Sequence, residues 1–148
     1  MYLVSLAGRI IKDKMMWAAV FAAPVTLSLL FWWQPELRSV TVQWPKEAIM
    51  LILLLPLIEE LAFRGYLQGR LAASAVQRFC IYGISGQNLI TTAVFSSFHL
   101  LSHSILWSLA VIIPSLIFGF FRDKYQSVIP AVMLHAYYNG MYFYFFAD

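Results

Sequence analysis

The chain has 148 residues, of which 61% are hydrophobic and only 11% are charged. Soluble domains carry about 25% charged residues, so this composition excludes an ordinary soluble protein. The formal net charge of +3 is small and the basic residues are dispersed, which gives no support to nucleic-acid binding. The single cysteine excludes a disulfide within the chain.

Long uncharged stretches predict an all-α, polytopic transmembrane helical bundle. Residues 15–33, 79–121 and 125–147 contain no Asp, Glu, Lys or Arg, and a helix needs about 20 apolar residues to cross a bilayer. We expect one integral membrane domain over residues 1–148, with about five crossings. They are Met15–Trp33, Ala48–Leu67, Gln87–Leu101, Ile105–Phe121 and Ser127–Phe146.

The third and fourth crossings are short and are joined tightly near residues 102–104. One crossing plus a broken, partly buried segment is therefore an alternative for this pair. Outside the crossings, residues 2–11 predict a short amphipathic helix on the membrane surface. Residues 68–86 carry apolar side chains at helical spacing and predict a second helix along that surface.

The basic residues predict a cytoplasmic N-terminus. With that orientation the cytoplasmic side holds eight basic residues and the opposite side two, which obeys the positive-inside rule. The eight are Arg9, Lys12, Lys14, Arg64, Arg70, Arg78, Arg122 and Lys124, and the two are Arg38 and Lys46.

In the segment "LILLLPLIEELAFRGYL" (51–67), an apolar run is followed by two adjacent glutamates, Glu59 and Glu60. Glu60 and Arg64 are four residues apart on the predicted helix, the spacing of an ion pair. Glu59 points about 100° away and cannot share that arginine in the same geometry. A carboxylate inside a membrane is a functional hypothesis by default. The alternative is that both glutamates lie in the headgroup region.

Two further helices carry polar residues. The segment "AVFSSFHLLSH" places His99 mid-helix with Phe95 one turn earlier, and "VMLHAYYNGMYFYFF" places His135 and Asn139 on one helical face. Hydrogen bonds within the bundle are the alternative interpretation of these residues. His103 has metal-ligand spacing from His99, but the expected turn puts it out of reach at the far end, as an interfacial histidine.

The expected depths of these residues indicate one shared site. At 1.5 Å per helical residue, Glu59 lies roughly 16 Å from the cytoplasmic edge of its span, His99 roughly 18 Å and His135 roughly 12 Å. Three separate helices thus bring polar side chains to similar depths.

The motifs E-E-x-x-x-R (59–64), F-x-x-x-H (95–99) and H-x-x-x-N (135–139) occur in this order. This pattern resembles the CPBP group of intramembrane endopeptidases, which comprises the CAAX prenyl proteases of the Ras-converting type and their bacterial relatives. The resemblance covers about residues 46–146.

The resemblance implies a glutamate protease without metal or cofactor that cleaves a membrane-anchored protein or peptide. Glu59 would be the general base, and His99 would help to hold and polarise the attacking water. His135 and Asn139 would stabilise the oxyanion.

The resemblance further implies that Glu60 pairs with Arg64, while Phe95 is a motif position without a clear chemical role. The long CAAX-processing relatives have about eight spans, and only five fit here. Either the spans that shape the substrate groove are missing or a homo-oligomer supplies them. The small size indicates a bacterial relative in the inner membrane, and no pattern specifically indicates recognition of a prenyl group.

Two other functions compete with this prediction. A zinc-dependent intramembrane protease would use Glu59, His99 and His135 as ligands, joined by His103. However, the sequence contains no H-E-x-x-H, and Asn139 suits an oxyanion better than a metal. A non-catalytic membrane protein for binding or immunity would use the polar cluster only for helix packing.

Overall fold

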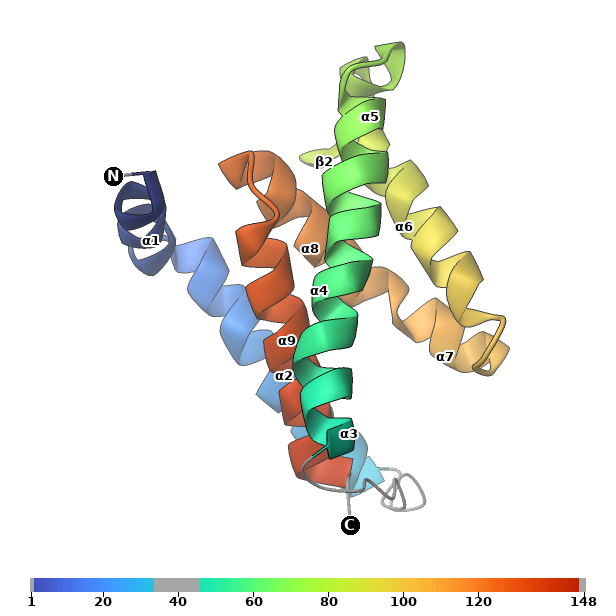
Figure 1. The fold of residues 1–148 in the computed structure, drawn as a ribbon. Helices are drawn as coiled ribbons and strands as arrows, with labels where there is room; N and C mark the ends of the chain where they lie inside the picture. The colour runs from blue at the N-terminus through green and yellow to red at the C-terminus, as the bar shows by residue number, and fades with distance from the viewer. Residues whose placement is uncertain (1, 34–45, 147–148) are drawn as a thin grey trace. The chain divides into compact units, whose positions relative to one another are not determined.

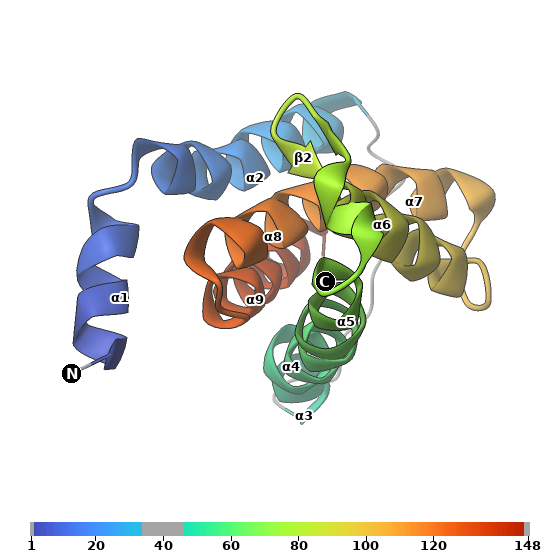
Figure 2. The same ribbon diagram turned by 90° about the horizontal axis from the view of Figure 1, so that it is seen from above.

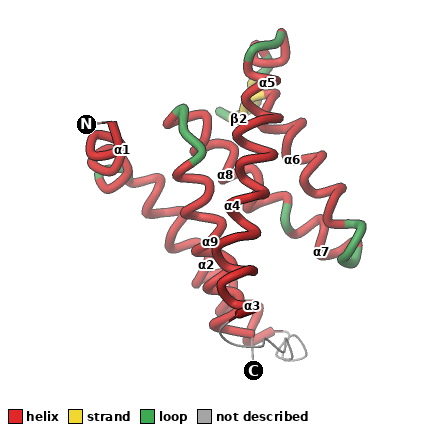
Figure 3. The backbone as a smooth tube through the Cα atoms, in the orientation of Figure 1, coloured by secondary structure: helices red, strands yellow, loops and turns green. Residues whose placement is uncertain are grey.

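The computed structural model describes residues 2–33 and 46–146, and helices dominate it (Figure 3). The predicted all-α class is confirmed, with one two-stranded hairpin added. The chain divides into two compact units, Met1–Leu57 with Met133–Asp148, and Ile58–Val132. Arg38, which entered the orientation argument, lies outside the described residues.

The first unit pairs the N-terminal span with the C-terminal helix. The bounds of helices α1 (Tyr2–Ile11) and α2 (Lys14–Trp33) agree with the helices predicted over residues 2–11 and 15–33. The C-terminal helix α9 (Ile129–Phe146) runs beside α2 (Figure 1). The Tyr138 hydroxyl donates to the backbone oxygen of Ala19 at 2.7 Å.

Helical residues follow one another without a break from Lys46 to Ala72, so the predicted span 48–67 is helical throughout. Two segments within this run have i→i+5 hydrogen bonds, the π-type geometry that is frequent at functional sites. In chain order the segments are α3 (Lys46–Ile49), π-helical η2 (Met50–Leu54), α4 (Leu55–Glu60), π-helical η3 (Leu61–Leu67) and α5 (Gln68–Ala72).

The predicted surface helix over residues 68–86 is wrong beyond Ala72. The chain forms a short 3₁₀ helix, η4 (Ala75–Arg78), and then an antiparallel hairpin of β1 (Cys80–Ile81) and β2 (Ile84–Ser85).

Local backbone chemistry explains this difference. The Ser74 hydroxyl accepts from Val76 N at 3.3 Å, which starts a new turn instead of extending α5. Tyr82 and Gly83 both have positive φ, +50° and +81°, as the two central residues of a tight hairpin turn require. Apolar spacing alone does not reveal such a turn.

The second unit continues with three helices, α6 (Gly86–His99), α7 (Ile105–Ala110) and α8 (Ile112–Tyr125). Pro114 lacks the N–H that would bond Ala110 O, which accounts for the break between α7 and α8. Helix α6 has 14 residues and is about 21 Å long, short of the roughly 30 Å hydrocarbon core.

Among the described residues, two helical stretches are long and apolar enough to cross a membrane. They are Lys14–Trp32 and Ile105–Tyr125. The prediction of a membrane protein thus has structural support, whereas the count of five crossings is not confirmed. The short α6 beside the long α7–α8 stretch is consistent with one crossing plus a shorter segment.

Burial in Ile58–Val132 is the reverse of that in a soluble domain. Large apolar side chains such as Leu61, Leu106 and Ile113 are exposed, while many polar ones are almost fully buried. Polar side chains that face the bundle interior and apolar ones outside are typical of helices packed in lipid. The buried polar residues include Glu60, Arg64, Gln68, Asn88, Thr91, Thr92, Ser108 and Ser115.

Helices α6 and α8 lie side by side (Figure 2). They approach closely at Gly119. The Asn88 side chain occupies the space that a Cβ on Gly119 would take, and its Nδ2 donates to Leu116 O at 2.9 Å. Asn88 therefore fits against α8 only because residue 119 has no side chain.

We expect Gly119→Ala to lower the free energy of unfolding by about 1–3 kcal/mol, because the new methyl group overpacks the α6–α8 contact. Gly140→Ala is the matched control, since its Cβ would meet only Ile52 Cγ2 at an ordinary 3.6 Å. Denaturant unfolding in detergent micelles measures both variants. Equal stabilities would contradict the close approach.

Candidate active site

A buried ion pair lies at the centre of the second unit. Arg64 Nη1 is 2.9 Å from Glu60 Oε1, and both side chains are 0% exposed. The pair has the i,i+4 spacing expected from the sequence, at the junction of α4 and η3. The negative charge of Glu59 also acts on the Arg64 guanidinium.

Hydrogen bonds to α8, continued from there into α6, hold this arginine. Arg64 Nη2 donates to the Ser115 hydroxyl at 2.7 Å and to the Ser115 backbone oxygen at 3.2 Å. Ser115 Oγ donates to Thr92 Oγ1 at 2.9 Å, and Thr92 Oγ1 donates to Asn88 Oδ1 at 3.2 Å. The guanidinium is therefore oriented by a chain of polar side chains on two neighbouring helices.

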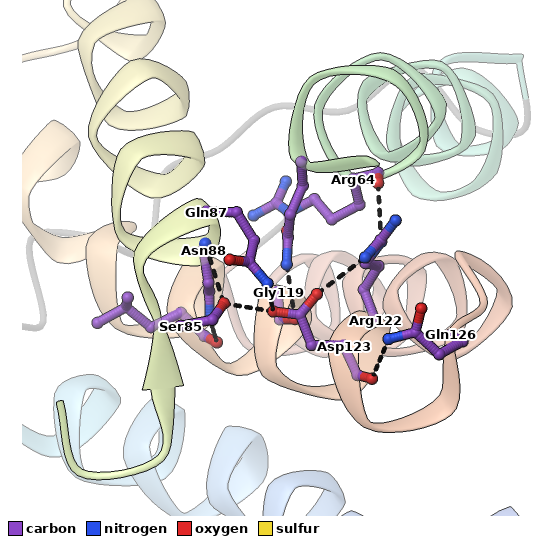
Figure 4. A network of polar contacts seen from close by, with 10 residues as sticks. Arg64, Ser85, Gln87, Asn88, Gly119, Arg122, Asp123 and Gln126 are labelled. Carbon is purple, nitrogen blue, oxygen red and sulfur yellow. Dashed lines mark hydrogen bonds and ion pairs between the residues drawn. The ribbon is translucent and has the colours of Figure 1, made fainter. Parts of the chain in front are cut away.

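A second group of contacts fixes η3 and α5 to α8 (Figure 4). Gln68 Nε2 donates to Gly119 O at 3.0 Å. Gln68 N–H bonds Phe63 O, five residues back, instead of Arg64 O. Arg122 Nε donates to that displaced Arg64 oxygen at 3.1 Å, and Arg122 Nη1 pairs with Asp123 at 2.9 Å.

Phe95 has a structural role that its motif position alone did not reveal. The Arg64 guanidinium carbon lies 4.5 Å from the Phe95 ring centroid, a cation–π distance. The imidazole of His99 lies 4.6 Å away, and Phe63 packs edge-on at 5.1 Å. The structure thus brings E-E-x-x-x-R and F-x-x-x-H into contact through Arg64 and Phe95.

The half-buried His99 has a defined tautomer when its ring is neutral. His99 Nδ1 lies 3.0 Å from Phe95 O. A carbonyl oxygen can only accept, so Nδ1 carries the hydrogen and Nε2 carries the lone pair. Nε2 can therefore accept a hydrogen bond from water. Glu59, half-buried on α4, precedes η3, which packs against α6.

The expected placement of His103 out of reach is wrong. Its ring lies 5.6 Å from that of His99, and His103 N donates to His99 O at 2.8 Å. The reason is that α6 ends at His99 and the chain turns at once. His103 is exposed, with Nδ1 2.8 Å from Ser102 Oγ. Across the described ranges, no three His, Cys, Asp or Glu side chains group closely enough to hold a metal ion.

The third motif belongs to the other unit. His135 lies on α9 and is 7% exposed. Asn139, one turn later, is half-buried, and its Nδ2 donates to Leu51 O at 2.9 Å. The convergence of all three motifs on one site stays a prediction.

The contact between Asn139 and Leu51 follows from the irregular hydrogen bonding of η2. Leu55 N–H, the α-helical donor for Leu51 O, bonds Met50 O instead. The π-helical donor would be residue 56, which is a proline without an N–H. Asn139 supplies the missing donor. Pro56 inside an apolar helix was a signal in the sequence for such an orphaned carbonyl.

We expect Asn139→Leu to lower the free energy of unfolding by about 1–3 kcal/mol, because it leaves the half-buried Leu51 carbonyl without a donor. In a Pro56→Ala background the penalty should shrink, since residue 56 then has an N–H for the helix. A double-mutant cycle in detergent measures this coupling. Strictly additive effects would show that Asn139 does not compensate for the proline.

We expect Phe95→Leu to lower the free energy of unfolding by about 2 kcal/mol, because the desolvated Arg64 loses its cation–π partner. Phe98→Leu is the control, since Phe98 also contacts Phe63 but is 57% exposed. The same unfolding assay compares the two variants. A larger loss for Phe98→Leu would contradict the role given to Phe95.

Comparison with known proteins adds the family. Residues 41–141, more than half of the chain, match the family model described as type II CAAX prenyl endopeptidase Rce1-like. No curated protein and no solved structure matches the chain significantly. The matched family implies protease activity in a membrane, on a membrane-anchored protein. The chain belongs to the Rce1-like family of type II CAAX prenyl endopeptidases.

Proposed function

We propose that this protein hydrolyses a peptide bond of a membrane-anchored protein or peptide, with a water molecule activated by Glu59 and His99. The observation that carries the proposal is the junction of Arg64 and Phe95, where the glutamate motif and the histidine motif pack together. Family membership supports the reaction class.

The proposed chemistry uses both groups on one water molecule. The Glu59 carboxylate takes one proton, and His99 Nε2 accepts a hydrogen bond from the other O–H. The water oxygen then attacks the carbonyl carbon of the scissile bond. As the tetrahedral intermediate collapses, the proton held by Glu59 moves to the leaving amine, so one carboxylate serves as base and then as acid.

In this proposal, donors from His135 and Asn139 stabilise the oxyanion. Asn139 Nδ2 has two hydrogens, and the bond to Leu51 O uses one of them. The other is available for the developing negative charge. Such preorganised donors typically contribute about 10²–10³ in rate each. Leu51 thereby acts as a positioning group for the Asn139 amide.

Glu60, Arg64 and Phe95 are positioning residues in the proposed mechanism. Arg64 pairs with the Glu60 carboxylate at 2.9 Å, and we assign proton transfer to Glu59. Phe95 packs against both Arg64 and His99. Movement of the arginine would therefore displace the imidazole.

The proposed membrane context keeps one catalytic domain, with its motif-bearing core at residues 46–146 and about five crossings. We place the N-terminus in the cytoplasm and the protein in a bacterial inner membrane. The basic residues support this orientation.

We expect Glu59→Gln and His99→Ala each to reduce proteolysis at least about 100-fold, because each removes a group that acts on the water. Glu47→Gln makes the same chemical change earlier in the continuous helical run and should retain activity. The assay follows cleavage of a membrane-anchored peptide by purified protein in liposomes. Full activity of Glu59→Gln would contradict the role as general base.

Two further measurements separate the competing functions. Activity that persists after strong chelation, without stoichiometric zinc, supports the metal-independent mechanism, while activity lost by chelation and restored by zinc contradicts it. A binding or immunity role predicts that Glu59→Gln keeps its phenotype in cells. Loss of phenotype together with loss of cleavage supports the protease.

A further inference from the structure

Helix α1 exposes a continuous stripe of apolar side chains, and the proposed proteolytic mechanism does not use any of them. Leu3, Val4 and Ile11 are 64%, 78% and 63% exposed, and Ala7 is exposed between them. Residues at positions 3, 4, 7 and 11 share one face of a helix. In water such a stripe would be unfavourable, so it requires an apolar partner.

The remaining surface of α1 divides into two other faces. Leu6 is 3% exposed and Ile10, one turn later, is half-buried, so this side packs on the protein. Ser5 and Arg9 are exposed and form the polar side, and the exposed Lys12 follows directly after the end of the helix. The helix thus has a buried face, an exposed apolar face and an exposed basic face.

A hydrogen-bonded turn, residues 11–15, joins α1 to the first candidate span. Trp17 Nε1 donates to Ile11 O at 2.8 Å, which supplies a donor for a carbonyl at the end of α1. Asp13 Oδ1 accepts from Met15 N at 3.0 Å and caps the start of α2. The direction of α1 is therefore set relative to α2.

Length and charge define the partner. With ten residues, α1 is about 15 Å long and too short to cross a bilayer. Arg9, Lys12 and Lys14 against Asp13 give residues 2–14 a net charge of +2 (three minus one). Basic residues next to an apolar stripe are complementary to the anionic headgroups and acyl chains of a membrane surface.

We propose that α1 lies in the plane of the membrane and binds anionic phospholipid. Leu3, Val4, Ala7 and Ile11 contact the acyl chains, while the basic residues contact the lipid phosphates. Because the hydrogen-bonded turn holds α1 in a set direction relative to α2, the binding of α1 to lipid also sets the depth of α2 in the membrane. The proposal does not depend on proteolytic activity.

The first experiment tests the orientation of α1 in the full chain. Cys80 is the exposed free cysteine, so Val4→Cys and Ser5→Cys are each made on Cys80→Ser, labelled with a fluorophore and placed in nanodiscs that contain phosphatidylglycerol. A nitroxide on the lipid acyl chain should quench the Val4 probe, and aqueous iodide the Ser5 probe. Equal iodide quenching of both probes would overturn the in-plane orientation.

The second experiment tests the lipid charge. The triple variant Arg9→Gln, Lys12→Gln, Lys14→Gln is compared with the unsubstituted chain. Both are measured in phosphatidylcholine nanodiscs and in nanodiscs with equimolar phosphatidylcholine and phosphatidylglycerol. Each basic residue near an anionic surface contributes roughly fivefold to a binding equilibrium. In nanodiscs with phosphatidylglycerol at low salt, the ratio of docked to undocked α1 should therefore be about 100-fold lower in the triple variant than in the unsubstituted chain. The iodide accessibility of the Val4 probe reports this ratio.

The matched control is Arg70→Gln, Arg78→Gln, Lys124→Gln, which removes the same charge far from residues 2–14 in the chain and should leave the Val4 probe shielded. High salt should reduce the difference between the two lipid compositions for the unsubstituted chain. A Val4 probe equally shielded in both lipids, with or without Arg9, Lys12 and Lys14, would overturn the role of anionic lipid.

Discussion

The buried pair of Glu60 and Arg64 is the interaction around which the second unit is organised. Taking two charges out of water carries an effective penalty of several kcal/mol per ion, which good pair geometry and additional hydrogen bonds offset. Ser115 on α8 supplies such bonds, and Thr92 and Asn88 on α6 continue them. The hydrogen bonds of this guanidinium, continued through Ser115, therefore link three helices.

Both π-helical segments displace a backbone carbonyl from its usual partner, and in both a side chain replaces the missing donor. Asn139 serves Leu51 O in the first unit, and Arg122 serves Arg64 O in the second. A carbonyl withdrawn from water without a donor is costly, and these part-buried contacts link distant segments to the irregular helix. The proposed site lies on a helical run whose irregularity is compensated by tertiary contacts.

Local spacing was enough to predict the ion pair and the first span, because both depend on neighbours along one helix. The same kind of reasoning failed at residues 73–85, where positive φ at Tyr82 and Gly83 closes a hairpin. It also misplaced His103, because apolar composition does not show where α6 ends. The role of Phe95 required the fold, since its partner Arg64 is 31 positions away in the chain (95 minus 64).

The sequence by itself determined the helical class, the membrane environment, the three motifs and the family, because these depend on composition, short-range periodicity and residue identity. Only the tertiary structure decided which carbonyls lose their donors, which side chains replace them and how Phe95 joins Arg64 to His99. These features depend on contacts between residues far apart in the chain, and helical periodicity carries no information about such pairs.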